Sequence, residues 1–261
     1  MRQKLNEKLF KDTPIWLATG LPVLTYLAHF GFGSMGPEFY DAYIEHEFGV
    51  TEVATLFVLS FAIVLCIASL KLVRCLRDSL ITGWLTVFLV GAVYFLGEEA
   101  SWGQHLFGWQ TPESWAMGND QKETNLHNTG GVIGSLLDQI PRAVLTLSAL
   151  VLGFAYPVWR YIRQTPLDPS TRWFWLLPTP ACIAVGLLAP FASVPGKLIE
   201  DPPPALNLIY GEIKELLLAQ FLLIYILSFW TRIRQAAGFD PAKATVSNKG
   251  FQPNAGQSRE R

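Results

Sequence analysis

The sequence predicts an all-α, polytopic bundle of about six transmembrane helices. The first observation behind this prediction is composition: hydrophobic residues make up 51% of the chain, charged residues only 16%, and the mean hydropathy is +0.29. Soluble domains carry about 25% charged residues. A chain this apolar cannot cover a water-exposed surface with polar groups, so the lipid bilayer is its expected surroundings.

The second observation is the recurrence of long apolar segments. Crossing about 30 Å of hydrocarbon takes about 20 residues of helix, and six segments meet this need: 15–33, 52–70, 79–97, 143–162, 173–194 and 208–230. The first follows a basic start but is longer than the roughly 7–15 apolar residues of a signal peptide, so we interpret it as a span. Three prolines, Pro178, Pro180 and Pro190, predict a kink in the fifth.

These spans define one transmembrane domain over residues 1–231, followed by a tail over 232–261. The tail is rich in Gly, Pro, Asn, Gln and Ser, a composition typical of disorder. Residues 129–142 precede the fourth span and are too short to cross by themselves. We therefore expect a long outer loop that carries a short interfacial or re-entrant helix.

The distribution of basic residues predicts that both termini are cytoplasmic. With that orientation, every cytoplasmic segment is basic, and only Lys122, Arg142, Lys197 and Lys214 of the 20 Lys and Arg residues fall outside. Cytoplasmic loops are enriched in Lys and Arg. Most acidic residues and all four histidines (His29, His46, His105 and His127) fall in the outer half. This asymmetry is either ordinary loop solvation or the sign of a polar site on the outer face.

The long outer loop holds the residues best suited to chemistry. If the third helix continues through Phe107, Glu98 and His105 share one helical face at a spacing of seven residues. That spacing is about 10 Å along the axis, too far for both to bind one ion unaided. A second segment must return between them, and residues 125–128, which contain His127, are the candidate.

Two strings in this loop carry a family resemblance. The first is E-E-x-S-W-G-Q-x-x-F-G from Glu98 to Gly108, followed by T-P-E at 111–113; the second is N-x-Q-x-E-x-N-L-H-N from Asn119 to Asn128. In these roughly thirty residues the chain resembles a family of uncharacterised polytopic inner-membrane proteins of bacteria. The resemblance implies a multi-pass protein of the bacterial cytoplasmic membrane, but no particular activity.

The sixth helix is expected to contribute two further acidic residues to this site. Glu212 and Glu215 lie three residues apart, close enough to address one centre. Acids in a first helical turn are also favoured by the helix dipole alone. Glu215 lies deeper, where a charged carboxylate facing lipid would cost about 2–3 kcal/mol, so we expect it to face the bundle and to have a partner there.

The candidate residues follow from this reasoning. The candidate catalytic residues are Glu98, His127 and Glu215. The candidate metal ligands are Glu98, His105, His127, Glu212 and Glu215, a set of carboxylates and imidazoles that suits Zn²⁺ or Fe²⁺. Their expected hydrogen-bonding neighbours are Glu99, Ser101, Gln104, Asn125 and Asn128. The alternative is that these acids are solvated and the asparagines are turn residues.

Three classes of function fit these observations. The first is a metal-assisted membrane enzyme acting on a lipid or lipid-linked substrate, in which the ion generates hydroxide. The second is a transporter or channel with an acidic outer vestibule, although no paired broken helices indicate one. The third is a scaffold whose loop docks a periplasmic or membrane partner. No nucleic acid partner is expected, and the lipid-directed enzyme is the first hypothesis.

Overall fold

The computed structural model describes residues 10–40, 49–117, 119, 122–126, 132, 135–192, 194, 198–200 and 212–238. Within this part, six helical segments are long and apolar enough to cross a membrane: Ile15–Gly33, Val50–Leu76, Ser79–Glu99, Leu136–Arg163, Arg172–Phe191 and Glu212–Gly238. The predicted all-α, multi-pass architecture is therefore confirmed. The largest differences from the predicted bounds are at the start of the fourth segment and the end of the sixth; residues 208–211 and the tail from 239 lie outside the described residues.

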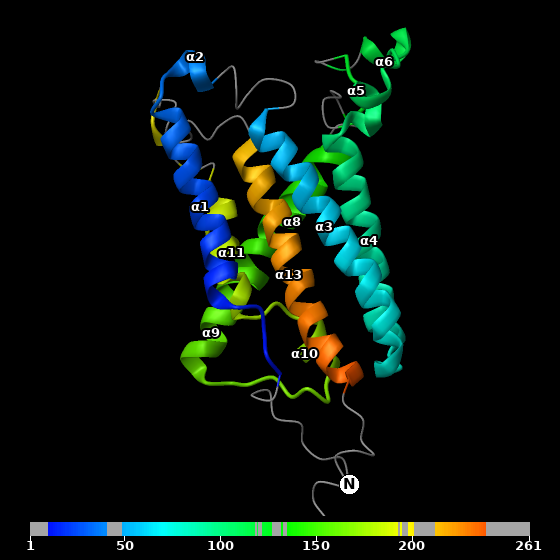
Figure 1. The fold of residues 1–261 in the computed structure, drawn as a ribbon, viewed down its shortest axis with the longest axis vertical. Helices are drawn as coiled ribbons and strands as arrows, with labels where there is room; N and C mark the ends of the chain where they lie inside the picture. The colour runs from blue at the N-terminus through cyan, green and yellow to red at the C-terminus, as the bar shows by residue number, and fades with distance from the viewer. Residues whose placement is uncertain are drawn as a thin grey trace, which may run out of the picture.

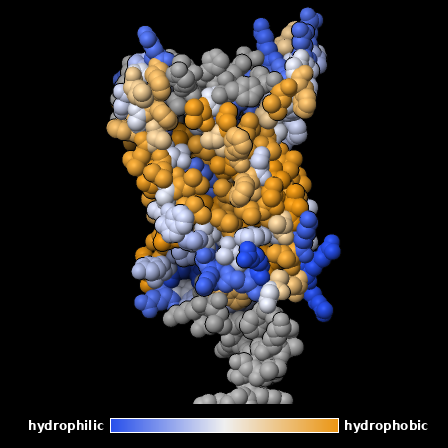
Figure 2. Space-filling model, viewed as in Figure 1, coloured by the Kyte–Doolittle hydropathy of each residue, from blue (hydrophilic) through white to orange (hydrophobic). Residues whose placement is uncertain are grey.

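The helices α1 (Ile15–Gly33), α3 (Val50–Leu72), α4 (Ser79–Glu99) and α13 (Glu212–Gly238) are the long continuous rods of the bundle (Figure 1). α13 is central and packs against α3, α11 (Ile183–Phe191) and α1, whereas α4 packs mainly on α3. We call the end where α4 ends and α13 begins the loop end, and the opposite end the tail end. Figure 2 shows an apolar band between these two ends, with hydrophilic residues gathered at both.

The fourth span is a continuous helical run that changes type three times. It consists of π-helical η5 (Ser135–Gln139), α8 (Ile140–Ser148), π-helical η6 (Ala149–Ala155) and α9 (Tyr156–Arg163). Residues 135–142 thus begin a spanning helix rather than a separate interfacial or re-entrant one. Hydropathy places the start too late because Asp138 and Arg142 read as charges, although they pair with each other one turn apart. Paired charges can be accommodated inside a helical bundle in a membrane.

The fifth span is broken rather than kinked, between α10 (Arg172–Leu176) and α11, with only the short 3-10 helix η7 (Pro180–Cys182) in the gap. Pro180 has no N–H to donate to the carbonyl of Leu176 four residues earlier. The hydroxyl of Tyr225 on α13 donates to that carbonyl at 2.8 Å. The next turn of α13 also contacts the gap, because Ser228 and Thr179 share a hydrogen bond of 2.9 Å.

The carbonyl that Pro178 leaves unpaired is also bound by a side chain of α13. Pro178 cannot donate to the carbonyl of Phe174, and the guanidinium of the buried Arg232 on α13 donates to this carbonyl instead. The arginine also lies over the Phe174 ring, with its Cζ atom 5.0 Å from the ring centroid. Because α13 supplies donors to carbonyls that the prolines leave unpaired, the break is tolerated at membrane depth.

The fourth and fifth spans meet at a contact that only glycine allows. A Cβ on Gly186 would lie 2.7 Å from the carbonyl oxygen of Ala149 and 2.7 Å from the carbonyl carbon of Gly153. These are backbone atoms, which cannot rotate away. Small residues that permit close backbone approach are a common basis of helix packing in membranes.

Candidate functional site

The loop motif begins where α4 ends. Ser101, Trp102 and Gly103 have φ of 43°, 52° and 89°, so three successive residues adopt the left-handed conformation and turn the chain sharply. This conformation costs about 1–2 kcal/mol for each non-glycine residue. The third helix therefore ends at Glu99, and the short α5 (Gln104–Phe107) is a separate element. The expectation that Glu98 and His105 share one face of a continuous helix is wrong.

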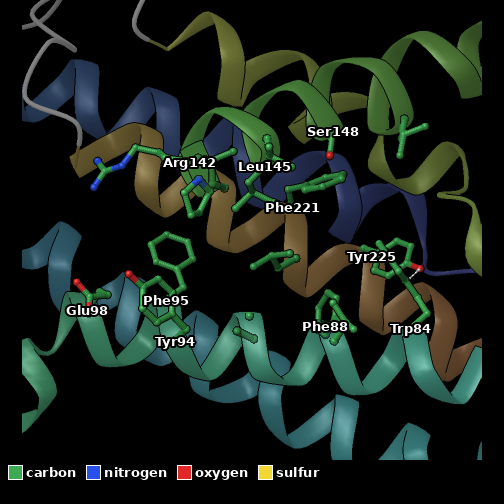
Figure 3. A pocket seen from close by; sticks show the side chains of 18 of the residues that line it. Trp84, Phe88, Tyr94, Phe95, Glu98, Arg142, Leu145, Ser148, Phe221 and Tyr225 are labelled. Atoms are coloured by element: carbon green, nitrogen blue, oxygen red, sulfur yellow. Dashed lines mark hydrogen bonds between the residues drawn. The ribbon is translucent and has the colours of Figure 1, made fainter. Parts of the chain in front are cut away.

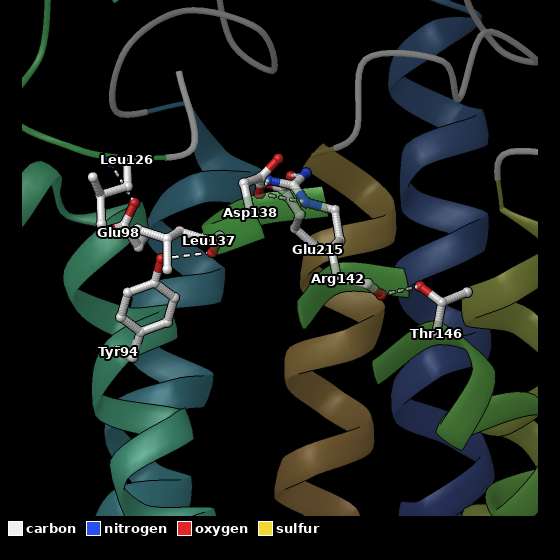
Figure 4. A network of polar contacts seen from close by, with 8 residues as sticks. All are labelled: Tyr94, Glu98, Leu126, Leu137, Asp138, Arg142, Thr146 and Glu215. Atoms are coloured by element: carbon white, nitrogen blue, oxygen red, sulfur yellow. Dashed lines mark hydrogen bonds and ion pairs between the residues drawn. The ribbon is translucent and has the colours of Figure 1, made fainter. Parts of the chain in front are cut away.

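Glu98 joins the two parts of the motif. Its carboxylate accepts a hydrogen bond of 2.7 Å from the indole N–H of Trp102. It also accepts one of 2.6 Å from the backbone N–H of Leu126, which Figure 4 shows. The Trp102 ring lies over Gly97, where a Cβ would come within 2.8 Å of it. Glu98 is buried. The return of residues 125–128 towards Glu98 is thus seen at Leu126; the predicted partner His127 lies outside the described residues.

The other polar residues of the motif bind one another. The Ser101 hydroxyl donates to the Glu123 carboxylate at 2.8 Å, and the Asn125 amide donates to the Ser101 hydroxyl at 3.0 Å. The Asn119 amide donates to the Asn125 side-chain oxygen at 3.0 Å. These four side chains are all buried. We call Ser101, Asn119, Glu123 and Asn125 the loop knot, since they tie residues 119–126 to the end of α4.

Gln104 adds to this connection. Its side-chain oxygen accepts hydrogen bonds from the backbone N–H of Thr124 at 2.6 Å and from the Thr111 hydroxyl at 3.0 Å. Three predicted neighbours of a metal site, Ser101, Gln104 and Asn125, therefore hold the loop in shape. Asn128 and the side chain of His105 lie outside the described residues.

A charged cluster lies at the same end of the bundle, where α4, the fourth span and α13 approach each other (Figure 4). Arg142 donates to Asp138 through Nε and Nη2, at 3.1 and 2.8 Å, and through Nη1 to Glu215. Glu215 is buried and points into the bundle, as its depth in the sixth span predicts. On α4, Glu99 lies within hydrogen-bonding reach of Glu215, with Glu212 and Arg142 close by. We call Glu99, Asp138, Arg142, Glu212 and Glu215 the mouth cluster.

Tyr94 connects α4 to the start of the fourth span. Its hydroxyl donates to the carbonyl of Leu137 at 2.7 Å. Pro141, four residues further on, has no N–H to donate to this carbonyl. The bond therefore satisfies a group that the proline leaves free and fixes the distance between the two helices just below the mouth cluster.

A cavity of about 460 Å³ lies between α4, the fourth span and α13. Figure 3 shows Glu98 and Arg142 at one end and Trp84 with Tyr225 at the other. The walls between them are apolar, from residues such as Phe88, Phe95, Leu145 and Phe221. Small residues, Gly91 and Ala92, line the middle of α4. The cavity runs along α4 from Trp84 to Glu98, fourteen residues or about 21 Å at 1.5 Å per residue.

The cavity ends at a hydrogen-bonded pair of residues at its tail end and reaches the surface at its side. The indole N–H of Trp84 donates to the Tyr225 hydroxyl at 2.7 Å, and this hydroxyl in turn donates to the carbonyl of Leu176. Val87 and Val144 line the cavity and are also exposed on the outside of the bundle, on the apolar band. A ligand can therefore enter from the hydrocarbon without crossing the water-facing ends.

The described residues contain no group of three His, Cys, Asp or Glu side chains that could hold a metal ion. In the mouth cluster, the Arg142 guanidinium binds one carboxylate oxygen of Asp138 and one of Glu215. The proposed Zn²⁺ or Fe²⁺ site depends on His127 and His105 and stays a prediction. The sequence analysis missed Asp138, Arg142 and Tyr94 as site residues. A signal was present: Arg142 is one of the few basic residues predicted outside, four residues after an acid.

No protein-family model, curated protein or solved structure matches this chain. The features of the molecule that indicate a function are therefore the cavity and the charged groups at its mouth.

Proposed function

We propose that this integral membrane protein binds a membrane lipid, with one hydrocarbon chain in the cavity and the head group at the mouth cluster. The observation that carries the proposal is the polarity of the cavity, which is apolar along its length and charged only at the loop end. A lipid has the same division. The volume of the cavity lies within the range of about 300–1,000 Å³ typical of ligand sites. The length of the cavity, about 21 Å, exceeds half of a hydrocarbon core of about 30 Å.

The same geometry favours lipid binding over a channel or transporter. A permeation path for a polar solute needs polar or hydrated walls, whereas this cavity is lined by apolar side chains and ends at Trp84 and Tyr225. A lipid-directed enzyme remains within the proposal. Glu99 and Glu215 would supply carboxyl groups for proton transfer beside the head group. The ion-assisted form of this enzyme would further require His127 at the same place.

We also propose that the loop end faces outward from a bacterial cytoplasmic membrane. Support comes from the tail end, where the loops and helix ends carry Lys71, Arg74, Arg77, Arg160, Arg163, Arg172, Arg232 and Arg234. Basic residues favour the cytoplasmic side. In a variant lacking native cysteines, Glu200→Cys should react with an impermeant thiol reagent in intact cells, and Thr165→Cys only after lysis. The reverse pattern would invert the orientation.

Cavity filling tests the lipid proposal. A Cβ added at Gly91 meets nothing within 4 Å, so Gly91→Leu adds bulk at the cavity lining without a clash at its Cβ. Gly83→Leu is the matched control, because Gly83 is equally open on the same helix and does not line the cavity. Native mass spectrometry of detergent-purified protein should show lipid retained by the wild type and Gly83→Leu and lost from Gly91→Leu. Equal retention by all three would refute the proposal.

A further inference from the structure

The mouth cluster contains one positive group, the guanidinium of Arg142, and not all of its N–H donors are bound to the carboxylates of the cluster. A guanidinium has five N–H groups, and the bonds from Arg142 to Asp138 and Glu215 use one on each of its three nitrogens. Among the described residues, one N–H on each terminal nitrogen of Arg142 has no hydrogen-bond acceptor assigned to it. The Arg142 side chain is also more exposed than its partners, 28% against 18% for Asp138 and 10% for Glu215. It lines the cavity, so these donors can reach the head group of a bound lipid.

The surrounding charge is negative. The carboxylates of Asp138 and Glu215 both bind the single guanidinium of Arg142, and Glu212 lies one helical turn before Glu215. A head group with only negative charge would accept hydrogen bonds from Arg142 but would be repelled by these carboxylates. At partly buried sites such repulsion is weakly screened. A head group with only positive charge would leave the arginine donors unused.

We propose that the ligand is a phospholipid with a zwitterionic head group that ends in a primary ammonium, as in phosphatidylethanolamine. The phosphate accepts from Arg142, and the ammonium donates to the carboxylate of Asp138, which lines the cavity beside Arg142. A primary ammonium brings three N–H donors. A quaternary ammonium brings none, so a choline head group lacks these hydrogen bonds. This inference rests on the proposed function, since it assumes that a lipid chain occupies the cavity.

The test is a competition among lipids with identical acyl chains. Delipidated protein in detergent is mixed with equal amounts of phosphatidylethanolamine, phosphatidylcholine and phosphatidylglycerol, and the bound species are counted by native mass spectrometry. We expect phosphatidylethanolamine to exceed each of the others about tenfold, the effect of one charge-assisted contact of about 1.4 kcal/mol. In Asp138→Asn the preference over phosphatidylglycerol should fall several-fold, because the carboxylate that binds the ammonium and repels an anionic head group is removed.

The outcomes separate this inference from the lipid proposal. If all three lipids bind equally or phosphatidylglycerol binds best, and Gly91→Leu abolishes binding of all of them, the head-group assignment is wrong while lipid binding stands. If Gly91→Leu binds lipid as well as Gly83→Leu does, the cavity is not the binding site and both proposals fail. The competition on the wild type decides the head group even if Asp138→Asn does not fold.

Discussion

Replacing Arg142 with glutamine should destabilise the folded protein substantially. The substitution removes the positive charge that Glu215 and Asp138 share, while keeping a side chain of similar reach. Removing one partner of a buried ion pair costs about 3–5 kcal/mol, because an uncompensated charge is left behind. The three side chains retain 28%, 18% and 10% exposure, so water relieves part of this cost. We therefore expect a loss of about 2–4 kcal/mol.

Circular dichroism in detergent micelles, followed through thermal unfolding, measures this loss. At about 2–4 °C per kcal/mol for a chain of this size, the transition should fall by at least about 4 °C. Arg163→Gln is the control, since Arg163 is exposed at the tail end and should change stability by no more than about 0.5 kcal/mol.

A double variant tests the reasoning further. Arg142→Gln combined with Glu215→Gln removes both members of the pair and should recover much of the lost stability, because neutral replacements of buried ion pairs are often tolerated. Partners in direct contact show such non-additivity. Strict additivity of the two single losses, or a loss of less than about 0.5 kcal/mol for Arg142→Gln alone, would show that the mouth cluster is not held together as described.

Three further predictions concern the bundle and the loop. Tyr225→Phe leaves the Leu176 carbonyl without its donor and should destabilise by about 1–3 kcal/mol in thermal unfolding; an unchanged transition would contradict the account of the broken fifth span. Gly186→Ala should lower stability by about 1–3 kcal/mol through overpacking, whereas Gly83→Ala should be nearly neutral, and similar values for both would refute the close contact. Asn125→Ala breaks the loop knot and should speed trypsin cleavage after the exposed Lys122 while the bundle's unfolding transition stays in place; unchanged cleavage would mean that the knot does not hold this segment.

The spans were predictable because the property that defines them is local. About 20 apolar residues in succession are visible in the sequence whatever the rest of the chain does. The start of the fourth span was not predictable, because Asp138 and Arg142 count as unpaired charges until their ion pair is known. The break at Pro178 and Pro180 was also predictable only in part. The prolines predict an interruption, but its form depends on donors that α13 provides.

The site was predictable as a region and not as a set of contacts. The sequence indicated that residues 125–128 return to Glu98, and the structure shows Leu126 there, but the bond comes from a backbone N–H that no residue type reveals. It also could not choose between Glu98 and Glu99 as the neighbour of Glu215. Consecutive residues point about 100° apart on a helix, so the choice depends on how α4 is rotated relative to α13.

The cavity itself argues for an occupant. The apolar side chains around this space of about 460 Å³ have no packing partners within it, and such a gap forfeits their dispersion contacts. Helix contacts do not close it, since Tyr94 bonded to Leu137 at one end and Trp84 bonded to Tyr225 at the other link its walls. The hydrocarbon chain of a lipid, which has direct access through the side of the bundle, restores the missing contacts, and the same bonds that keep the cavity open thereby select an elongated apolar ligand.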